Sequence, residues 1–182
     1  MKRKTTEISK FYYLYPQTVA FIGCADNIMP AAWHTPISAK PPLYGVLISP
    51  ERHTYTLLSE KNGFTINFLN HNRAGTSADT GSTSGRDLNK LTTYGIEHRQ
   101  GDRINGPILS QAYAAYECAY YATHELGDHF LFVGEIILIH YDDSYLEKGN
   151  VVDPKKIKPL LYFGKDRYIT VDPNTLVIKS RQ

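Results

Sequence analysis

One stretch of the sequence, residues 27–67, collects side chains that could bind a ligand. Its candidates are an indole, an imidazole, a guanidinium and three hydroxyls, contributed by Trp33, His34, Thr35, Ser49, Arg52 and Thr54. Hydroxyls, a guanidinium and the free N–H groups at the start of a helix bind phosphate, and an indole covers a flat ring. The stretch therefore predicts a site for a flat, anionic cofactor.

The same residues also have plain structural interpretations. Ser49 and Thr54 could each cap a helix, because short hydroxyl side chains accept hydrogen bonds from free N–H groups. Trp33 could be a packed surface ring, and Arg52 could be a solvated charge. The spacing of these residues leaves both interpretations open.

Several common catalytic motifs do not occur in the sequence. It contains no G-x-G-x-x-G after a predicted strand, so a Rossmann site is unsupported, and no G-K-[ST], which excludes a P-loop. The G-x-S-x-G motif of a nucleophile elbow is also absent. His124 and His129 are separated by Gly127 and lack the i, i+4 spacing of a zinc-binding pair. Cys24 and Cys118 lie in apolar runs, so we expect two reduced core thiols rather than a disulfide.

Composition limits the class of protein. The 182 residues fit one domain over residues 1–182, with a core at about 16–168, an N-terminal extension at 1–15 and a C-terminal tail at 169–182. A net charge of +2, from 20 basic and 18 acidic residues, gives no sign of a nucleic-acid or membrane partner. No apolar run reaches the ~18 residues of a membrane helix, so we expect a cytoplasmic protein.

The pattern of apolar residues predicts a mainly β protein with short helices. The many aromatic residues, 14 Tyr, 7 Phe and 1 Trp, favour sheets. Strands are expected at residues 18–24, 28–32, 43–48, 64–69, 113–123 and 130–141, with one more in the P-L-L-Y-F-G segment near the C-terminus. Short strands without a βαβ alternation indicate an antiparallel barrel.

The segments between these strands carry further predictions. Trp33 and its neighbours are expected on a loop that ends at Pro41–Pro42. A helix begins after Ser49 or after Thr54, depending on which residue caps it. Residues 70–86 are small and polar and predict a long loop with a functional or interfacial role, and residues 86–91 predict one helical turn.

Five segments, in this order, resemble the flavin reductase-like family. They are N-I-M-P-A-A-W-H-T-P-I-S-A-K-P-P-L, S-P-E-R-H-T-Y-T-L-L-S-E-K-N-G-F-T-I-N, S-G-R-D-L-N-K-L, E-C with G-D-H-F-L-F-V-G-E-I, and P-L-L-Y-F-G. The resemblance runs from about Pro16 to Tyr168 and is strongest to the flavoredoxin and ferric-reductase-like branch. It implies an FMN-binding split β-barrel, antiparallel and Greek-key-like, that works as a homodimer with flavin near the subunit interface.

The resemblance also implies roles for individual residues. The isoalloxazine and ribityl chain would be lined by Ala32, Trp33, His34 and Thr35. The phosphate end would be held by Ser49, Arg52 and Thr54. Asn67 would lie near the flavin, Lys90 near its phosphate and His129 beside the nicotinamide or flavin. Asn67 could instead cap its own backbone, and Lys90 could be a solvated lysine.

Two departures favour the flavoredoxin-like branch. Where the two-component branch often has T-A-N-S or T-A-S-S, this chain has residues 30–33 as P-A-A-W, and where that branch often has D-K-F, this chain has N-K-L at 89–91. The implied activity is hydride transfer from NAD(P)H to FMN, followed by electron transfer to flavin, ferric iron or a partner protein. The alternatives are a flavin-binding electron carrier without a nicotinamide site, and a β-barrel that binds another ligand.

Overall fold

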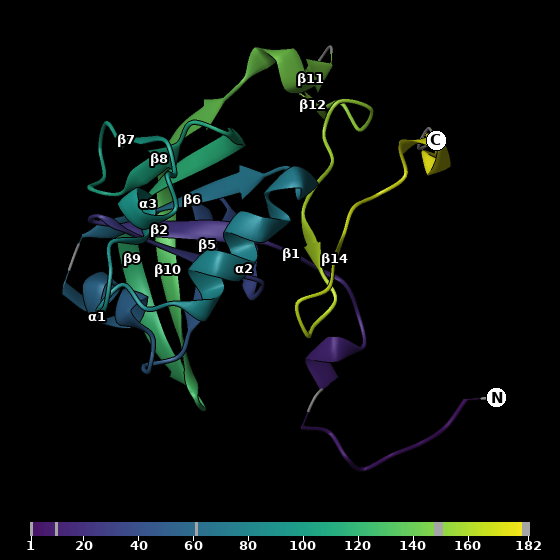
Figure 1. Cartoon of the computed structure of the whole chain (residues 1–182), viewed down its shortest axis with the longest axis horizontal. Helices are drawn as coiled ribbons and strands as arrows, with labels where there is room; N and C mark the ends of the chain where they lie inside the picture. The colour runs from purple at the N-terminus through teal and green to yellow at the C-terminus, as the bar shows by residue number, and fades with distance from the viewer. Residues whose placement is uncertain (1, 10, 61, 148–150, 180–182) are drawn as a thin grey trace.

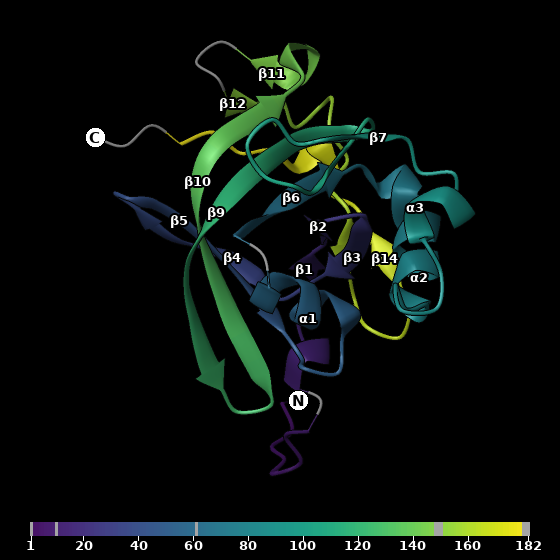
Figure 2. The same ribbon diagram turned by 90° about the vertical axis from the view of Figure 1, so that its left-hand side faces the viewer.

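A curved antiparallel sheet forms the centre of the protein (Figures 1 and 2). The computed structural model describes residues 2–9, 11–60, 62–147 and 151–179. The sheet has seven strands in the order β3-β2-β6-β9-β10-β5-β4. Their bounds are β2 Ala20–Cys24, β3 Asn27–Ala31, β4 His34–Ala39, β5 Pro42–Ile48, β6 Gly63–Leu69, β9 Ala112–Leu126 and β10 His129–Tyr141. The predicted mainly β, antiparallel architecture is confirmed.

The longest strands, β9 and β10, curve the sheet. Their pairing shifts register between Val133 and Gly134 and again between Ile136 and Leu138. Such bulges bend a strand and increase its twist. At Gly134 the two strands and β6 pack closely, because a Cβ there would lie 2.6 Å from Cys118 Cβ. The bend is therefore compatible with glycine and with no larger residue.

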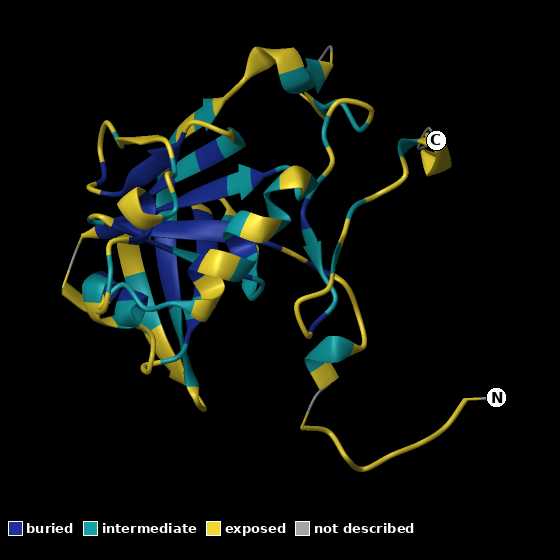
Figure 3. Ribbon diagram, viewed as in Figure 1, coloured by how far each residue is buried: buried dark blue, intermediate teal, exposed yellow. Residues whose placement is uncertain are grey.

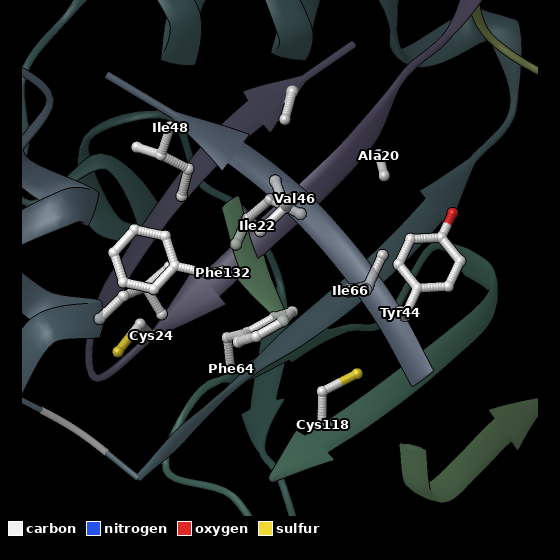
Figure 4. Packing of buried hydrophobic residues seen from close by; sticks show 12 residues of the cluster. Ala20, Ile22, Cys24, Tyr44, Val46, Ile48, Phe64, Ile66, Cys118 and Phe132 are labelled. Atoms are coloured by element: carbon white, nitrogen blue, oxygen red, sulfur yellow. The ribbon is translucent and has the colours of Figure 1, made fainter. Parts of the chain in front are cut away.

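The main hydrophobic core lies against the inner face of this sheet (Figures 3 and 4). Its buried side chains include Ile22, Val46 and Phe132. Cys24 and Cys118 are also buried there, and Cys24 Sγ donates to the Gly63 carbonyl at 3.7 Å. Burial raises the pKa of the Cys118 thiol to about 12, which keeps it protonated and unreactive, as expected for a core thiol.

The segment after residue 32 is a strand, so the loop predicted for it is wrong. β4 pairs antiparallel with β5, with His34 opposite Val46. β4 is the last strand of the sheet, and an edge strand tolerates Pro36 because one side of its backbone needs no ladder hydrogen bond. The β4–β5 turn lies at Lys40–Pro41, where the double proline was expected to interrupt the sheet.

The helices differ from the sequence predictions in their bounds. The α-helices are α1 His53–Glu60, α2 Ala74–Ser82 and α3 Lys90–Thr93, and the 3-10 turns are η1 Phe11–Tyr13, η2 His71–Arg73, η3 Asp143–Tyr145 and η4 Pro173–Thr175. α1 begins at His53, so neither predicted cap is right: Ser49 heads the turn before the helix and Thr54 is its second residue. The predicted turn at 86–91 is displaced to α3, which Asn89 caps by accepting from Thr92 N at 3.1 Å.

The long loop predicted at 70–86 is also wrong, because most of it is η2 and α2. The side chains of α2 are small, and the buried ones, Ser77 and Thr80, are polar. A Cβ on Gly81 would lie 3.2 Å from Pro30, which shows how closely α2 approaches β3. Tertiary packing of a small-residue face therefore outweighs the weak helix propensity of these residues.

The remaining short strands lie around the barrel. They are β1 Gln17–Thr18, β7 His98–Gln100, β8 Pro107–Leu109, β11 Leu146–Glu147, β12 Val151–Val152, β13 Leu161–Tyr162 and β14 Tyr168–Ile169. β13 pairs with β1 and β14, so the P-L-L-Y-F-G segment does return to the body of the protein. Residues 180–182 of the expected C-terminal tail lie outside the described residues. In the described part of the chain, no helix has the length and apolar character needed to cross a membrane.

Candidate functional site

A large cavity lies between two walls from distant parts of the chain. Its volume is about 1250 Å³. Residues 29–33 and 47–54 form one wall, and residues 77–88 with Lys90 form the other. The turn between β9 and β10 and the β13–β14 hairpin add residues at its margin. The Arg86 guanidinium donates to the Glu51 carbonyl at 3.0 Å and so links the two walls.

Seven of the ten predicted site residues line this cavity: Ala32, Trp33, Ser49, Arg52, Thr54, Lys90 and His129. They come from four separate segments of the chain, which the sheet, α1 and α3 bring together. The structure does not bring His34, Thr35 or Asn67 to the cavity.

Two of the cations that line the cavity, Lys90 and Arg52, lie close to each other. Lys90 is only 4% exposed, and its Nζ donates to the Thr80 carbonyl at 2.6 Å. Burial, together with the positive charge of Arg52, lowers the pKa of Lys90 to about 8. Within the described ranges, neither Lys90 nor Arg52 forms an ion pair with a carboxylate. A buried ammonium beside a second cation is costly unless an anion compensates it, so the pair indicates an anion site.

The turn before α1 presents hydroxyls beside these cations. Arg52 N donates to the Ser49 carbonyl at 3.0 Å, which closes the turn and leaves the Ser49 hydroxyl at the cavity. The buried Thr54 hydroxyl accepts from Asn27 Nδ2 at 2.9 Å. Thr54 is therefore held by β3 and can still donate its own hydroxyl proton.

An aromatic pair forms another part of the lining. The rings of Trp33 and His129 lie 4.8 Å apart at 41° to each other. His129 Nδ1 lies 2.7 Å from Asp128 Oδ1, and this contact lowers the pKa of the Asp128 carboxyl. Nε2 has no hydrogen-bond partner in the part of the chain that the structure describes. The pair gives the cavity an aromatic surface, with His129 Nε2 available to a ligand.

His34 and Thr35 lie outside the cavity because β4 directs them elsewhere. His34 Nδ1 contacts the Tyr44 hydroxyl at 2.7 Å, and its Nε2 contacts the Thr18 carbonyl at 3.0 Å. Burial lowers the pKa of His34, and the Thr18 contact opposes this. Thr35 is exposed, with its hydroxyl 3.3 Å from the Pro36 carbonyl. His34 therefore joins β4 to the segment before β2.

Asn67 is a structural residue of the core, so its implied place near the flavin is not supported. It is fully buried, and its Nδ2 donates to the carbonyls of Phe21 and Pro107 at 3.3 and 3.1 Å. Its Oδ1 accepts from Leu109 N at 2.8 Å. The amide joins β2, β6 and β8, and it is buried and does not line the cavity.

The cavity wall at residues 77–88 contains site residues that the sequence predictions missed. It presents Thr80, Thr83, Ser84 and Arg86 to the cavity. The sequence contains a pattern that could have predicted these residues. The S-T-S-G-R segment combines small hydroxyl residues, glycine and a cation, as phosphate sites do. At Gly85 a Cβ would lie 2.2 Å from Asn27 Oδ1, so this wall approaches β3 through a glycine.

Known proteins share this fold and sequence pattern. Residues 12–170 match the family model described as the flavin reductase like domain. The crystal structure of the FMN-binding protein from Thermus thermophilus with bound 1-cyclohex-2-enone has 34% identity and a TM-score of 0.85, covering 98% of this chain and 99% of that one. The crystal structure of a flavoredoxin from Methanosarcina acetivorans has 28% identity and a TM-score of 0.82. This match covers 94% of this chain and 92% of that one.

A curated relative, an uncharacterized protein of Aeropyrum pernix, is 32% identical over 140 residues. The match covers 76% of this chain but only 52% of that protein, so the chain spans about half of its length. The family match covers most of the chain, and the sheet has the architecture of the split barrels among the similar structures. The protein is thus a member of the flavin reductase-like family with the split-barrel fold.

Proposed function

We propose that the protein is an FMN-binding oxidoreductase that takes hydride from NAD(P)H and passes electrons to flavin, ferric iron or a protein acceptor. The observation that carries this proposal is the pair of uncompensated cations, Lys90 and Arg52, in a cavity that also presents Trp33 and His129. A terminal phosphate supplies the missing negative charge, and a flat ring matches the aromatic pair.

The cavity residues fit FMN in chemistry and in size. Lys90 and Arg52, with the hydroxyls of Ser49 and Thr83, would hold the phosphate. Ala32 and Trp33 would cover the ring system. A cavity of about 1250 Å³ exceeds the space of a single drug-sized ligand, which leaves room for a second substrate. When bound, FMN supplies the capacity to accept and donate hydride or single electrons.

The residues of this chain supply orientation and proton handling. Asp128 engages His129 Nδ1 and so fixes which imidazole nitrogen faces a ligand. His129 Nε2 can then hydrogen-bond to the second substrate or hold a proton beside it. Trp33 excludes water from the same side of the cavity.

The similar structures support flavin binding, and they are also compatible with an alternative function, that of an electron carrier. One of them is described as an FMN-binding protein and another as a flavoredoxin. A flavoredoxin-type electron carrier would need the same phosphate and ring contacts but no nicotinamide site. The two functions therefore differ in whether a reduced nicotinamide reacts with the bound flavin.

Purified protein tests the proposal directly. The chromophore should be identified by absorbance and mass spectrometry, and the holoprotein should be mixed anaerobically with NADH and with NADPH. We expect bound FMN, and bleaching of its absorbance by at least one nucleotide. Bound flavin that neither nucleotide reduces would favour the electron carrier. A protein that binds no flavin would contradict both functions.

Substitution of His129 by alanine tests its place in turnover. We expect His129→Ala to lower NAD(P)H oxidation by about tenfold or more, since an imidazole acting in proton transfer contributes at least that much, while FMN content stays unchanged. Rapid-mixing reduction rates and bound-flavin absorbance measure the two quantities. His124→Ala is the matched control, because His124 is exposed on the same hairpin and lies outside the cavity. Equal losses of FMN and turnover in His129→Ala would show a structural role only.

We further propose that the protein forms a homodimer. Ile137, Ile139 and Tyr141 alternate along β10 and are 44%, 51% and 55% exposed. Residues i, i+2 and i+4 of a strand lie on one face, so these side chains form a continuous apolar strip. Large exposed apolar strips mark interfaces, and a second copy of the chain is the partner that family membership supports.

A further inference from the structure

The N-terminal aromatic segment, residues 11–13, packs against Trp33 from outside the cavity. The Tyr12 ring lies 5.5 Å from the Trp33 ring in an edge arrangement, and the Phe11 ring lies 6.3 Å from it. Neither Phe11 nor Tyr12 lines the cavity. Trp33 therefore contacts both this segment and the His129 ring, which lies 4.8 Å from it.

The same segment is fixed at a second point. Gly164, in the β13–β14 hairpin, has a φ of +79°, and a Cβ there would lie 2.3 Å from the Tyr13 ring. Tyr13 thus packs directly on the glycine backbone, and its ring also contacts Tyr12 at 4.7 Å. Figure 1 shows η1 beside this hairpin. The three aromatic residues connect the hairpin at the cavity margin to Trp33.

We propose that Tyr12 is a positioning residue that holds the Trp33 indole against His129, so that the two rings form the surface on which the second substrate binds. This inference rests on the proposed function of the cavity. Edge-to-face aromatic contacts are directional, so the Tyr12 ring restricts the orientation of the indole. Without that contact, Phe11 alone of the segment would cover this side of Trp33, and the indole would be more exposed to water and freer to rotate away from His129.

The sequence offers a direct reporter, because Trp33 is the one tryptophan of the chain. Its fluorescence in protein stripped of flavin measures the mobility and solvent access of the indole itself. We expect Tyr12→Ala to lower the time-resolved anisotropy of Trp33 and to raise its quenching by acrylamide about twofold or more. Tyr12→Phe keeps the ring and should restore wild-type values.

Kinetics provide the second readout. Tyr12→Ala should raise KM for NAD(P)H about three- to tenfold, the scale of one lost aromatic contact, with little change in kcat and unchanged affinity for FMN. Tyr15→Ala is the matched control, since Tyr15 is an exposed tyrosine of the same segment with no ring contact among the described residues.

The outcomes separate this inference from the proposed function. If Tyr12→Ala and Tyr15→Ala both match the wild type in indole mobility and KM, the positioning role is wrong while the function stands. If the wild type binds FMN but does not oxidise NAD(P)H, the proposed function fails, and the fluorescence readout alone then decides whether Tyr12 orients Trp33. A Tyr12→Ala variant that loses FMN affinity in proportion to KM would also overturn the positioning role.

Discussion

Lys90 and Arg52 show how two side chains can select the charge of a ligand. The Lys90 ammonium is buried, and among the described residues it donates to the neutral Thr80 carbonyl. Arg52 lies close enough to lower the pKa of Lys90 further. Neither cation forms an ion pair with a carboxylate of the described residues. An anionic group bound there would relieve the repulsion as well as form hydrogen bonds.

Removal of the guanidinium should weaken FMN binding specifically. We expect Arg52→Ala to lower the affinity for FMN by about 1.5–3 kcal/mol, the usual contribution of a hydrogen bond to a charged group. Calorimetric titration of FMN into protein stripped of flavin measures this affinity. Affinity for riboflavin, which lacks the phosphate, should be unchanged. Arg103→Ala is the control, because Arg103 is exposed outside the cavity. An unchanged affinity for FMN in Arg52→Ala would remove Arg52 from the phosphate site.

The lowered pKa of Lys90 makes FMN affinity depend on pH. In the free protein Lys90 loses its proton near pH 8, compared with an ordinary value of 10.5. A bound phosphate favours the charged form and raises the pKa, so the favourable charge interaction is complete below about pH 8 and declines above it. We expect the Kd for FMN to rise from about pH 8 upward, by at most tenfold per pH unit.

Titrations at a series of pH values, with riboflavin as the uncharged comparison, measure this dependence. Lys90→Met removes the titrating group and should give weaker binding that no longer changes between about pH 8 and about pH 10. If the Kd for FMN rises with pH equally in Lys90→Met and in the wild type, a group other than Lys90 causes the pH dependence.

At the level of elements, the Asn67 side chain links neighbouring strands by hydrogen bonds rather than contacting a cofactor. We expect Asn67→Ala to lower the free energy of unfolding by about 2–4 kcal/mol, because it removes the acceptor of Leu109 N and the amide donor to the carbonyls of Phe21 and Pro107. Urea denaturation measures the loss, and Asn72→Ala, at an exposed asparagine of η2, should be neutral. If Asn67→Ala leaves the free energy of unfolding unchanged but weakens FMN binding, Asn67 belongs to the FMN site.

Long strands such as β9 and β10 were predictable from the sequence because their apolar and aromatic residues favour a sheet. The Ser49–Thr54 turn lines the cavity, but hydroxyl side chains there suit a helix cap as well as a ligand, so the sequence left both roles open. The sequence left two roles open for Asn67, because a polar residue in a strand can face a ligand or the backbone, and only the neighbouring strands decide which. α2 was missed because its small residues show no apolar period, and its packing on β3 appears only once both are folded.

At the scale of the whole molecule, the cavity depends on contacts between the two ends of the chain. Residues 11–13 and the β13–β14 hairpin meet at Tyr13 and Gly164, and the hairpin contributes Tyr162 and Tyr168 to the lining. β1 and β13 pair beside them. The terminal segments thus complete a cavity whose cations, Lys90 and Arg52, come from the middle of the chain.

The exposed strip on β10 gives the last prediction, about assembly. Light scattering coupled to size-exclusion chromatography should give a mass near twice the 20.6 kDa of one chain. Ile139→Asp should shift the protein to a monomer, because a charge buried at an apolar interface is strongly unfavourable. Ile8→Asp is the control, since Ile8 is 73% exposed in the N-terminal segment, away from the sheet. A monomeric wild type, or a dimer that Ile139→Asp leaves intact, would show that this strip is not the interface.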